Sequence, residues 1–333
     1  YSGNATLQQR DGYNRLNLMD AYDRIILSRD INAAGLHYER TMSSLNIGYE
    51  GLLNKFESKG LTRAEFKGEL DRMARMNTDW FSLLYRNALM QSHAASVSGG
   101  NDNTTYYSSI GVDLQPGTAR AEQSDRYTVL AKINSWVVPK RVYVGMQLNA
   151  SMTKNAGYNG VNPKTYAYKT ARTIPAYNPD GSLFYYEPYS TLGAGKDALK
   201  YNVLDEISHT GMTSDALQMT AKLNFQWNII EHLRYELQAS YAKNQTVRNS
   251  WMDSDSYGVA SIRGYSRDYY VGVRTDEWNE SPLPQGGVLS YGSNSVGTWN
   301  VRNQLSWNQE INHDHVVSVM GVSEVRSSKT DGF

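Results

Sequence analysis

The chain has 333 residues, and its 33 basic side chains are balanced by 33 acidic ones, so the formal net charge is zero. This balance argues against a nucleic-acid partner, because proteins that bind a phosphate backbone usually carry a basic excess. Cysteine is absent, which excludes disulfides and thiolate metal sites, whereas 25 tyrosines and seven tryptophans supply many aromatic side chains with a polar end.

The N-terminal part predicts one strand followed by helices. Residues 1–10 begin with alternating apolar and polar side chains, which is typical of a strand with one wet face. In the segments 20–31 and 62–91 the apolar spacing shifts toward the helical period, and the second segment opens with a T-x-x-E capping box. We therefore expect 11–92 to be a helical or irregular excursion.

From residue 93 onward the sequence predicts antiparallel hairpins. The clearest is 217–241, in which apolar and polar residues alternate without exception over 217–229 and alternate again from Leu233, after a bend at Glu231-His232. Further hairpins are predicted around the turns 100–103 and 139–140, and a less regular pair of strands at 299–307 and 315–325. Between the hairpins lie two long loops, 152–215 and 245–297.

Strand length distinguishes a transmembrane β-barrel from a soluble β-sandwich. Strands of a soluble β-sandwich usually have about five or six residues, whereas these run for about nine to thirteen, enough to cross a bilayer at a tilt. Trp227 and Trp299 are predicted near strand ends, where aromatic girdles meet the lipid interface. Short turns on one side and long loops on the other also favour a partial transmembrane antiparallel β-barrel over 93–333.

Three stretches resemble the SusC/RagA family of TonB-dependent outer-membrane transporters. The first runs from Asn77-Thr78-Asp79-Trp80-Phe81 through Gln91-Ser92-His93 to Ser98-Gly99-Gly100 and is similar to the family's "TDW … Q.H … SGG" pattern. The second, "RTIPAYNPDG" at 172–181, resembles the family's "R-x-x-P-x-Y-x-x-D-G" loop. The third is the segment 315–325, with Gly321 and Glu324 in a "G-x-x-E" pattern.

The resemblance implies a fold and a set of partners. In this family a 22-stranded barrel, closed by an N-terminal plug, imports nutrients that a surface lipoprotein captures. We therefore expect about nine of the 22 strands here, with 1–333 as one partial barrel domain and with the plug and the TonB-binding region outside this chain. The expected location is the outer membrane of a Gram-negative cell. The expected partners are a SusD-like lipoprotein, the TonB complex, membrane lipid and a glycan or peptide.

Other functions stay open at this point. A passive porin or a surface adhesin could use the same barrel without energy coupling, and a soluble carbohydrate-binding sandwich is a third alternative. No nucleophile, phosphate-loop or metal-ligand pattern occurs in the sequence. We accordingly expect no enzyme activity, no cofactor and no metal.

Recognition is predicted to lie in the long loops, which are rich in aromatic residues. Aromatic faces stack on sugar rings and on peptide side chains, and nearby charged residues supply directional hydrogen bonds. The candidate ligand-binding residues are Tyr177, Asp180, Tyr185, Tyr186, Trp251, Tyr265, Arg267, Tyr269 and Trp278. The alternative is that these side chains pack the loops together or against a lipoprotein. The strands between the loops are predicted to line a wet interior with polar residues whose mixed charge gives no strong selectivity for anionic or cationic solutes. These polar wall residues are Gln218, Lys222, Asn224, Gln226, Arg234, Glu236 and Gln238.

Overall fold

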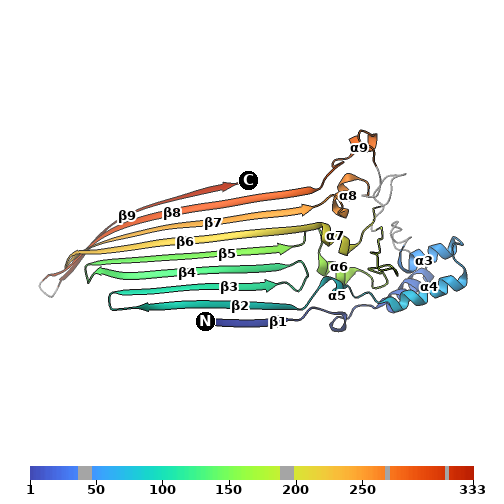
Figure 1. Cartoon of the computed structure of the whole chain (residues 1–333), viewed down its shortest axis with the longest axis horizontal. Helices are drawn as coiled ribbons and strands as arrows, with labels where there is room; N and C mark the ends of the chain where they lie inside the picture. Colours follow the sequence, from blue (N-terminus) through green and yellow to red (C-terminus); the bar gives the residue numbers. More distant parts are fainter. Residues whose placement is uncertain (37–46, 188–198, 267–270, 312–314) are drawn as a thin grey trace.

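A computed structural model describes residues 1–36, 47–187, 199–266, 271–311 and 315–333. It contains a nine-stranded antiparallel sheet in which each strand pairs with its neighbours in sequence (Figure 1). The described strands do not close into a ring, because β1 and β9 are the two edges. The predicted partial barrel of about nine strands is therefore confirmed. The strands are β1 Ser2–Gln8, β2 Ala88–Gly100, β3 Thr104–Pro116, β4 Gln123–Val138, β5 Val142–Gly157, β6 Thr210–Ile230, β7 Leu233–Met252, β8 Val288–Ile311 and β9 His315–Gly332.

The helices gather at one end of the sheet, opposite the short turns (Figure 1). Among the described residues, four α-helices lie between β1 and β2, two lie between β5 and β6, and two lie between β7 and β8. None of the helices in the described segments is both long enough and apolar enough to cross a membrane. The helices are η1 Tyr13–Arg15, α1 Ala21–Ala33, α3 Gly48–Glu57, α4 Arg63–Met76, α5 Trp80–Leu84, α6 Pro163–Lys169, α7 Val203–His209, α8 Tyr257–Arg263 and α9 Asp276–Glu280.

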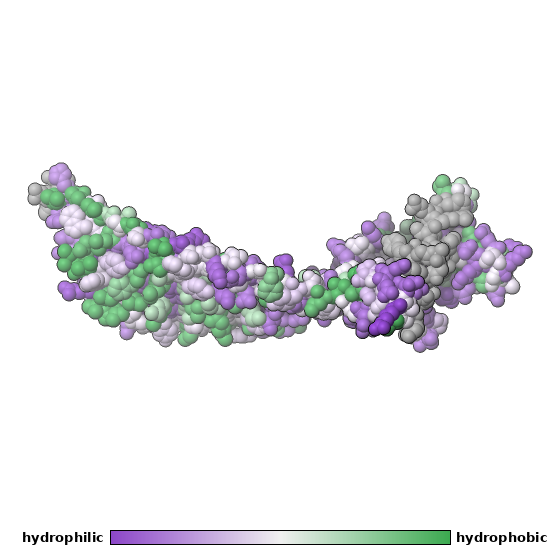
Figure 2. All heavy atoms as spheres, turned by 90° about the horizontal axis from the view of Figure 1, so that it is seen from above, coloured by the Kyte–Doolittle hydropathy of each residue, from purple (hydrophilic) through white to green (hydrophobic). Residues whose placement is uncertain are grey.

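One face of the sheet is apolar over the half nearer the short turns. Residues paired across strands share a face, and the register places Leu223 of β6 between Met146 of β5 and Ala239 of β7. Side chains on this face stay uncovered, with Trp227 44% and Leu305 46% exposed. Figure 2 shows apolar residues gathered over this half, whereas the loop end is mainly hydrophilic. Such a surface indicates contact with lipid or with another apolar surface.

Aromatic residues border this apolar face. Trp227 lies near the end of β6, as predicted, and pairs with Tyr235 of β7. The prediction for Trp299 was wrong, because β8 begins well before it and Trp299 lies in the middle of the strand. It pairs with Tyr241, and Lys243 is the next residue of β7 on this face. The opposite face carries the predicted polar wall residues Gln218, Lys222, Asn224, Gln226, Arg234, Glu236 and Gln238.

The structure corrects the predicted helix over 62–91. The capping box of Thr62 is present, but α4 ends where Asn77 adopts a left-handed φ of 43°. A short α5 follows, capped by the side chain of Asp79. Ala88 already begins β2, because residues 88–91 pair with β1. The excursion predicted over 11–92 therefore ends before Ala88.

Both long loops are shorter than predicted. The expected loop 152–215 shrinks to 158–209, because the end of β5 pairs with the start of β6 as far as Gly157 and Met212. The expected loop 245–297 shrinks to 253–287, because β7 and β8 pair as far as Met252 and Val288. Toward these strand ends polar residues such as Lys154, Lys243 and Gln245 interrupt the apolar face, so hydrophobic alternation does not reveal the full strands, although backbone pairing holds them.

A small helical unit stands apart from the sheet. α1, α3 and α4 share a core made by Ile25, Tyr49, Leu52 and Met73. α3 was not predicted as a separate helix, and its N-cap residue, Ile47, supplies no side-chain hydrogen bond. Helix start signals of the usual polar kind are therefore missing there.

Candidate functional site

The two sequence motifs most typical of the family contact each other in the structure. The backbone N–H of Thr78 donates to the carbonyl of Arg172 at 3.0 Å, and the Thr78 hydroxyl donates to the carbonyl of Ile174 at 2.7 Å. The Arg172 guanidinium returns a hydrogen bond to the Asn77 carbonyl at 3.4 Å and lies over the ring of Tyr13. The motifs thus fasten the loop after β5 to the segment that precedes β2.

A hydrophobic cluster fills the space beneath these contacts. Trp80, Phe81 and Leu84 of α5 are almost fully buried, and they pack with Val203 of α7 and Ala167 of α6. We call the segments 77–87, 158–187, 199–209 and 253–266 the loop assembly. Its core places the long loops on a fixed platform at the helical end of the sheet.

Tyrosine rings extend this core toward α8. The ring of Tyr201 contacts the rings of Tyr166, Tyr186 and Tyr257 with centroids 6.1, 5.8 and 5.1 Å apart. The Tyr166 and Tyr186 hydroxyl oxygens lie 3.2 Å apart. Burial raises the pKa of both Tyr166 and Tyr201. These rings mainly pack one loop against another. Packing was the alternative to ligand binding that the sequence left open for the loop aromatics.

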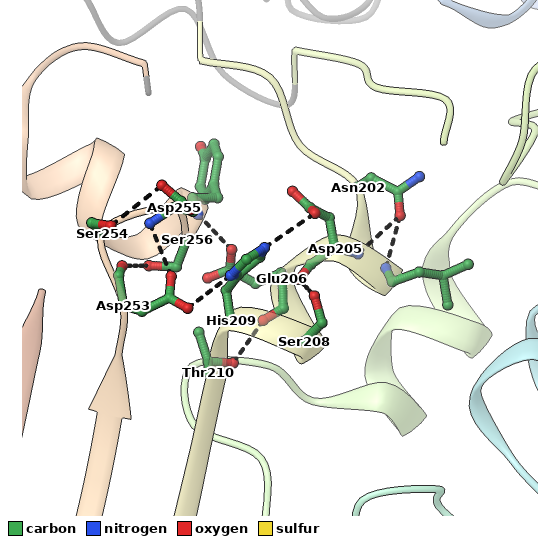
Figure 3. A network of polar contacts seen from close by, with 12 residues as sticks. Asn202, Asp205, Glu206, Ser208, His209, Thr210, Asp253, Ser254, Asp255 and Ser256 are labelled. Atoms are coloured by element: carbon green, nitrogen blue, oxygen red, sulfur yellow. Dashed lines mark hydrogen bonds and ion pairs between the residues drawn. The ribbon is translucent and has the colours of Figure 1, made fainter. Parts of the chain in front are cut away.

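A polar joint connects the loop before β6 with the loop after β7 (Figure 3). Nδ1 of His209 lies 2.7 Å from a carboxylate oxygen of Asp253, and its Nε2 lies 3.5 Å from Asp205. The buried carboxylate of Glu206 accepts hydrogen bonds from the backbone N–H groups of Tyr257 and Gly258, at 2.5 and 3.1 Å. One short helix, α7, therefore holds both the end of β7 and the start of α8.

The charges at this joint shift the ionisation of two groups. The hydrogen bond that His209 donates to the Asp253 carboxylate, together with the charges of Asp253, Asp205 and Asp255, raises the pKa of His209 despite its partial burial. Burial raises the pKa of Glu206, and its two backbone hydrogen bonds oppose that effect. One potential metal-ligating atom from each of the residues His209, Asp253 and Asp255 lies within 4.8 Å of the other two.

We expect the joint to weaken as the pH rises. Because the pKa of His209 is raised on folding, its stabilising contribution is complete below the unfolded value of roughly 6.5 and is lost as pH rises through the folded value. Hydrogen exchange at 253–258 in the full-length protein, corrected for intrinsic rates, should therefore accelerate toward alkaline pH. Asp253→Asn should flatten this profile, whereas His232→Gln, in the β6–β7 turn, should leave it unchanged. Identical profiles for Asp253→Asn and the parent protein would contradict the assignment.

A small polar pocket of about 120 Å³ opens beside the joint. Its lining includes the aromatic residues Tyr185 and Tyr257 and the acidic residues Asp205, Glu206 and Asp255. The pocket combines a stacking surface with hydrogen-bonding groups. Of the predicted ligand-binding residues in the described segments, Tyr185 lines this pocket.

Two other predicted residues form a tight turn. Tyr177 forms an isolated bridge with Leu183, and Gly181 between them has a φ of 85°. The Asp180 carboxylate accepts hydrogen bonds from the N–H and the hydroxyl of Ser182, which lower its pKa. Asp180 shapes this turn, while Tyr177 remains 46% exposed.

The structure separates the remaining predicted residues. Tyr265 is buried, and its hydroxyl donates to the Pro284 carbonyl at 3.0 Å. Trp251 lies on β7 beside Gly211, and Trp278 is half-buried in α9. Tyr186 belongs to the tyrosine cluster described above. Arg267 and Tyr269 lie outside the described residues.

Sequence reasoning missed the polar joint. His209 and Asp253 are 44 positions apart, and their contact exists because β6 and β7 extend to Thr210 and Met252, which pair with each other. The alternating pattern stops short of these strand ends. A capping signal was present, since Asn202 precedes α7 and accepts from the N–H of Leu204.

Curated relatives of the chain are named TonB-dependent receptors. No family model matches the chain. It is 22% identical over 255 residues to TonB-dependent receptor P26 of Formosa agariphila, a match that covers 77% of this chain and 23% of that protein. It is 27% identical over 115 residues to TonB-dependent receptor P3 of the same organism, covering 32% of this chain and 11% of that protein. The chain thus spans less than a quarter of the length of P26.

Solved structures with the same fold include those of a peptide transporter. The structure of the RagAB peptide transporter matches 99% of this chain and 34% of its own chain, with a TM-score of 0.62 and 16% identity. The RagAB peptide importer in its open-open state matches with a TM-score of 0.60 and 17% identity, covering 99% and 34% of the two chains. The resemblance of this chain to the barrel of SusC/RagA-type TonB-dependent transporters, indicated first by its sequence motifs, is therefore confirmed.

Proposed function

We propose that the chain forms part of the barrel wall and the loop assembly of an outer-membrane transporter. That transporter imports oligosaccharides or peptides with energy from the TonB complex and works together with a SusD-like surface lipoprotein. In this proposal 1–333 is one partial barrel domain, and the plug lies elsewhere in the full-length protein. The oligosaccharide or peptide substrate and both partners follow from the family resemblance.

The observation that carries this proposal is the two-faced sheet. Its strands are far longer than the five or six residues usual in soluble sheets. One face is apolar and uncovered, the other is polar, and all long connections lie at one end. This is the arrangement of an outer-membrane barrel, in which lipid covers one face and a wet interior the other.

Uptake by the full-length protein tests the proposal. In a Gram-negative host lacking the native gene, we expect fluorescent oligosaccharides or peptides to accumulate only when the proton-motive force and the lipoprotein are present. Tyr185→Ala and Trp278→Ala should lower this uptake several-fold because each removes a stacking surface, while Tyr22→Ala, at an exposed tyrosine of α1, serves as the matched control.

Two results would count against it. Uptake that persists after the proton-motive force is collapsed, combined with a large steady conductance in planar bilayers, would favour the passive porin. Unchanged uptake in the Tyr185 and Trp278 variants, with normal folding, would remove the binding role of these loop residues and leave them as packing residues.

A further inference from the structure

The strand register aligns three unpaired cations on the polar face of the sheet. Lys132 of β4 and Lys222 of β6 both pair with Gln147 of β5. Residues that pair in this way form a row across the strands, and the row continues from Lys222 through Ser240 and Asn300 to Arg326 of β9. We call Lys132, Lys222 and Arg326 the cationic row. Sequence order conceals it, because its members are 90 and 104 positions apart (222−132 and 326−222).

The cationic row has no internal partners. All three side chains are exposed, and within the described segments none of them forms an ion pair or a side-chain hydrogen bond. Neighbouring strands lie about 4.8 Å apart, so the cations are separated by roughly 10 and 14 Å across the sheet. A single extended polyanion could therefore contact all three.

Other charges near the row do not neutralise it. Arg302 lies one row away on the same face and donates to Gln304 at 3.2 Å. Glu324, opposite Arg302, accepts a hydrogen bond from Asn300 at 2.6 Å. Four cations thus face one carboxylate over two adjacent rows. Farther toward the short turns, Arg234 and Glu236 pair with each other at 3.1 Å.

The side chains between the cations indicate the kind of anion. Gln147, Ser240 and Asn300 lie in the row itself, and Asn224 and Gln238 lie in the next row. Amide and hydroxyl groups both donate and accept hydrogen bonds, as sugar hydroxyls do. Within these two rows no aliphatic side chain on β5 to β8 offers a site for an apolar peptide residue.

We propose that the cationic row binds an acidic oligosaccharide, one carrying carboxylate or sulfate groups, on the inner wall of the transporter. The inference rests on the proposed function, because it takes the polar face as the wet interior. It replaces the expectation that mixed wall charge gives no selectivity. Charge attraction supplies the preference for anions, and the intervening amides and hydroxyls supply the preference for a sugar.

Equilibrium binding to the purified full-length protein tests this inference. The probe is a fluorescent galacturonic-acid hexamer, compared with its fully methyl-esterified, uncharged form and with hexaglutamate. We expect the acidic hexamer to bind best, and more weakly as salt concentration rises. The triple variant Lys132→Gln, Lys222→Gln, Arg326→Gln should weaken binding by about tenfold or more.

A matched control removes three cations from the other face. Lys154→Gln, Lys243→Gln and Lys329→Gln change the same net charge in the same sheet, because these residues alternate onto the side opposite the row. This variant should bind the acidic hexamer within about twofold of the parent protein. The charge-conserving variant Lys132→Arg, Lys222→Arg, Arg326→Lys should retain binding, which guards against misfolding as the cause of a loss.

Each opposing result has a defined meaning. Equal binding by the triple variant and the parent would overturn the inference and leave the row as a contact surface for the plug, and equal binding of the esterified probe would overturn it as well. Tightest binding of hexaglutamate would assign the row to acidic peptides instead. Because binding is measured without transport, a protein that binds the acidic hexamer but shows no energy-dependent uptake would reject the proposed function and leave the cationic row intact.

Discussion

Replacing Trp80 with alanine is expected to destabilise the loop assembly by about 3–5 kcal/mol, the usual cost of deleting a buried Trp or Phe side chain. Trp80 is 1% exposed and contacts the edge of Tyr166 with ring centroids 5.0 Å apart. Its indole N–H also donates to the Ala171 carbonyl at 3.5 Å. The sheet should persist, because its backbone pairing does not depend on this side chain.

Limited proteolysis of the full-length protein in detergent provides the measurement. Cleavage within 158–187 should accelerate by at least roughly a hundredfold if local opening is in equilibrium with the closed state. Trp80→Phe should have a smaller effect, and Trp227→Ala, on the apolar face, should leave cleavage of this segment unchanged. A Trp80→Ala protein with parental cleavage rates would show that the cluster does not hold the loops.

Replacing Glu206 with alanine should release α8 from α7. The substitution leaves the backbone N–H groups of Tyr257 and Gly258 without their acceptors, at a cost of about 2–4 kcal/mol. The burial that raises the pKa of Glu206 shows that its charged form is already disfavoured there, so we expect the lower part of this range.

Hydrogen exchange at 257–263 measures this release. Protection should fall in Glu206→Ala and fall less in Glu206→Gln, since the amide keeps one acceptor oxygen. Glu277→Gln, at an exposed residue of α9, is the control for loss of a carboxylate. Equal protection in Glu206→Ala and the parent protein would mean that α8 is held by other contacts.

The strands of the sheet were predictable because period-two alternation reports directly on a two-faced wall. Residues 217–229 alternate without exception, and the structure places them in β6 with the apolar set on one face. The turn at 100–103 was recognised from its sequence, and the Asn101 side chain accepts from the N–H of Thr104 there. Side-chain chemistry within a few residues decides both features.

The candidate site was less predictable, because contacts between distant segments create it. Tyr185 and Tyr186 are neighbours in sequence, yet one lines the pocket and the other packs against Tyr201. His209 meets Asp253 only after β6 and β7 reach their full length. The cationic row likewise depends on register, which a one-residue slip in any strand would abolish.

The length of β8 has a consequence for how the protein meets its surroundings. A tilted strand needs only about 9–11 residues to cross a bilayer, whereas β8 has 24 residues and β6 and β7 have 21 and 20. At about 3.3 Å per residue, β8 measures roughly 80 Å from end to end. With the apolar half in lipid, the remainder would rise above the headgroups as a rigid rim. In the proposed transporter, the loop assembly would then stand well away from the lipid headgroups.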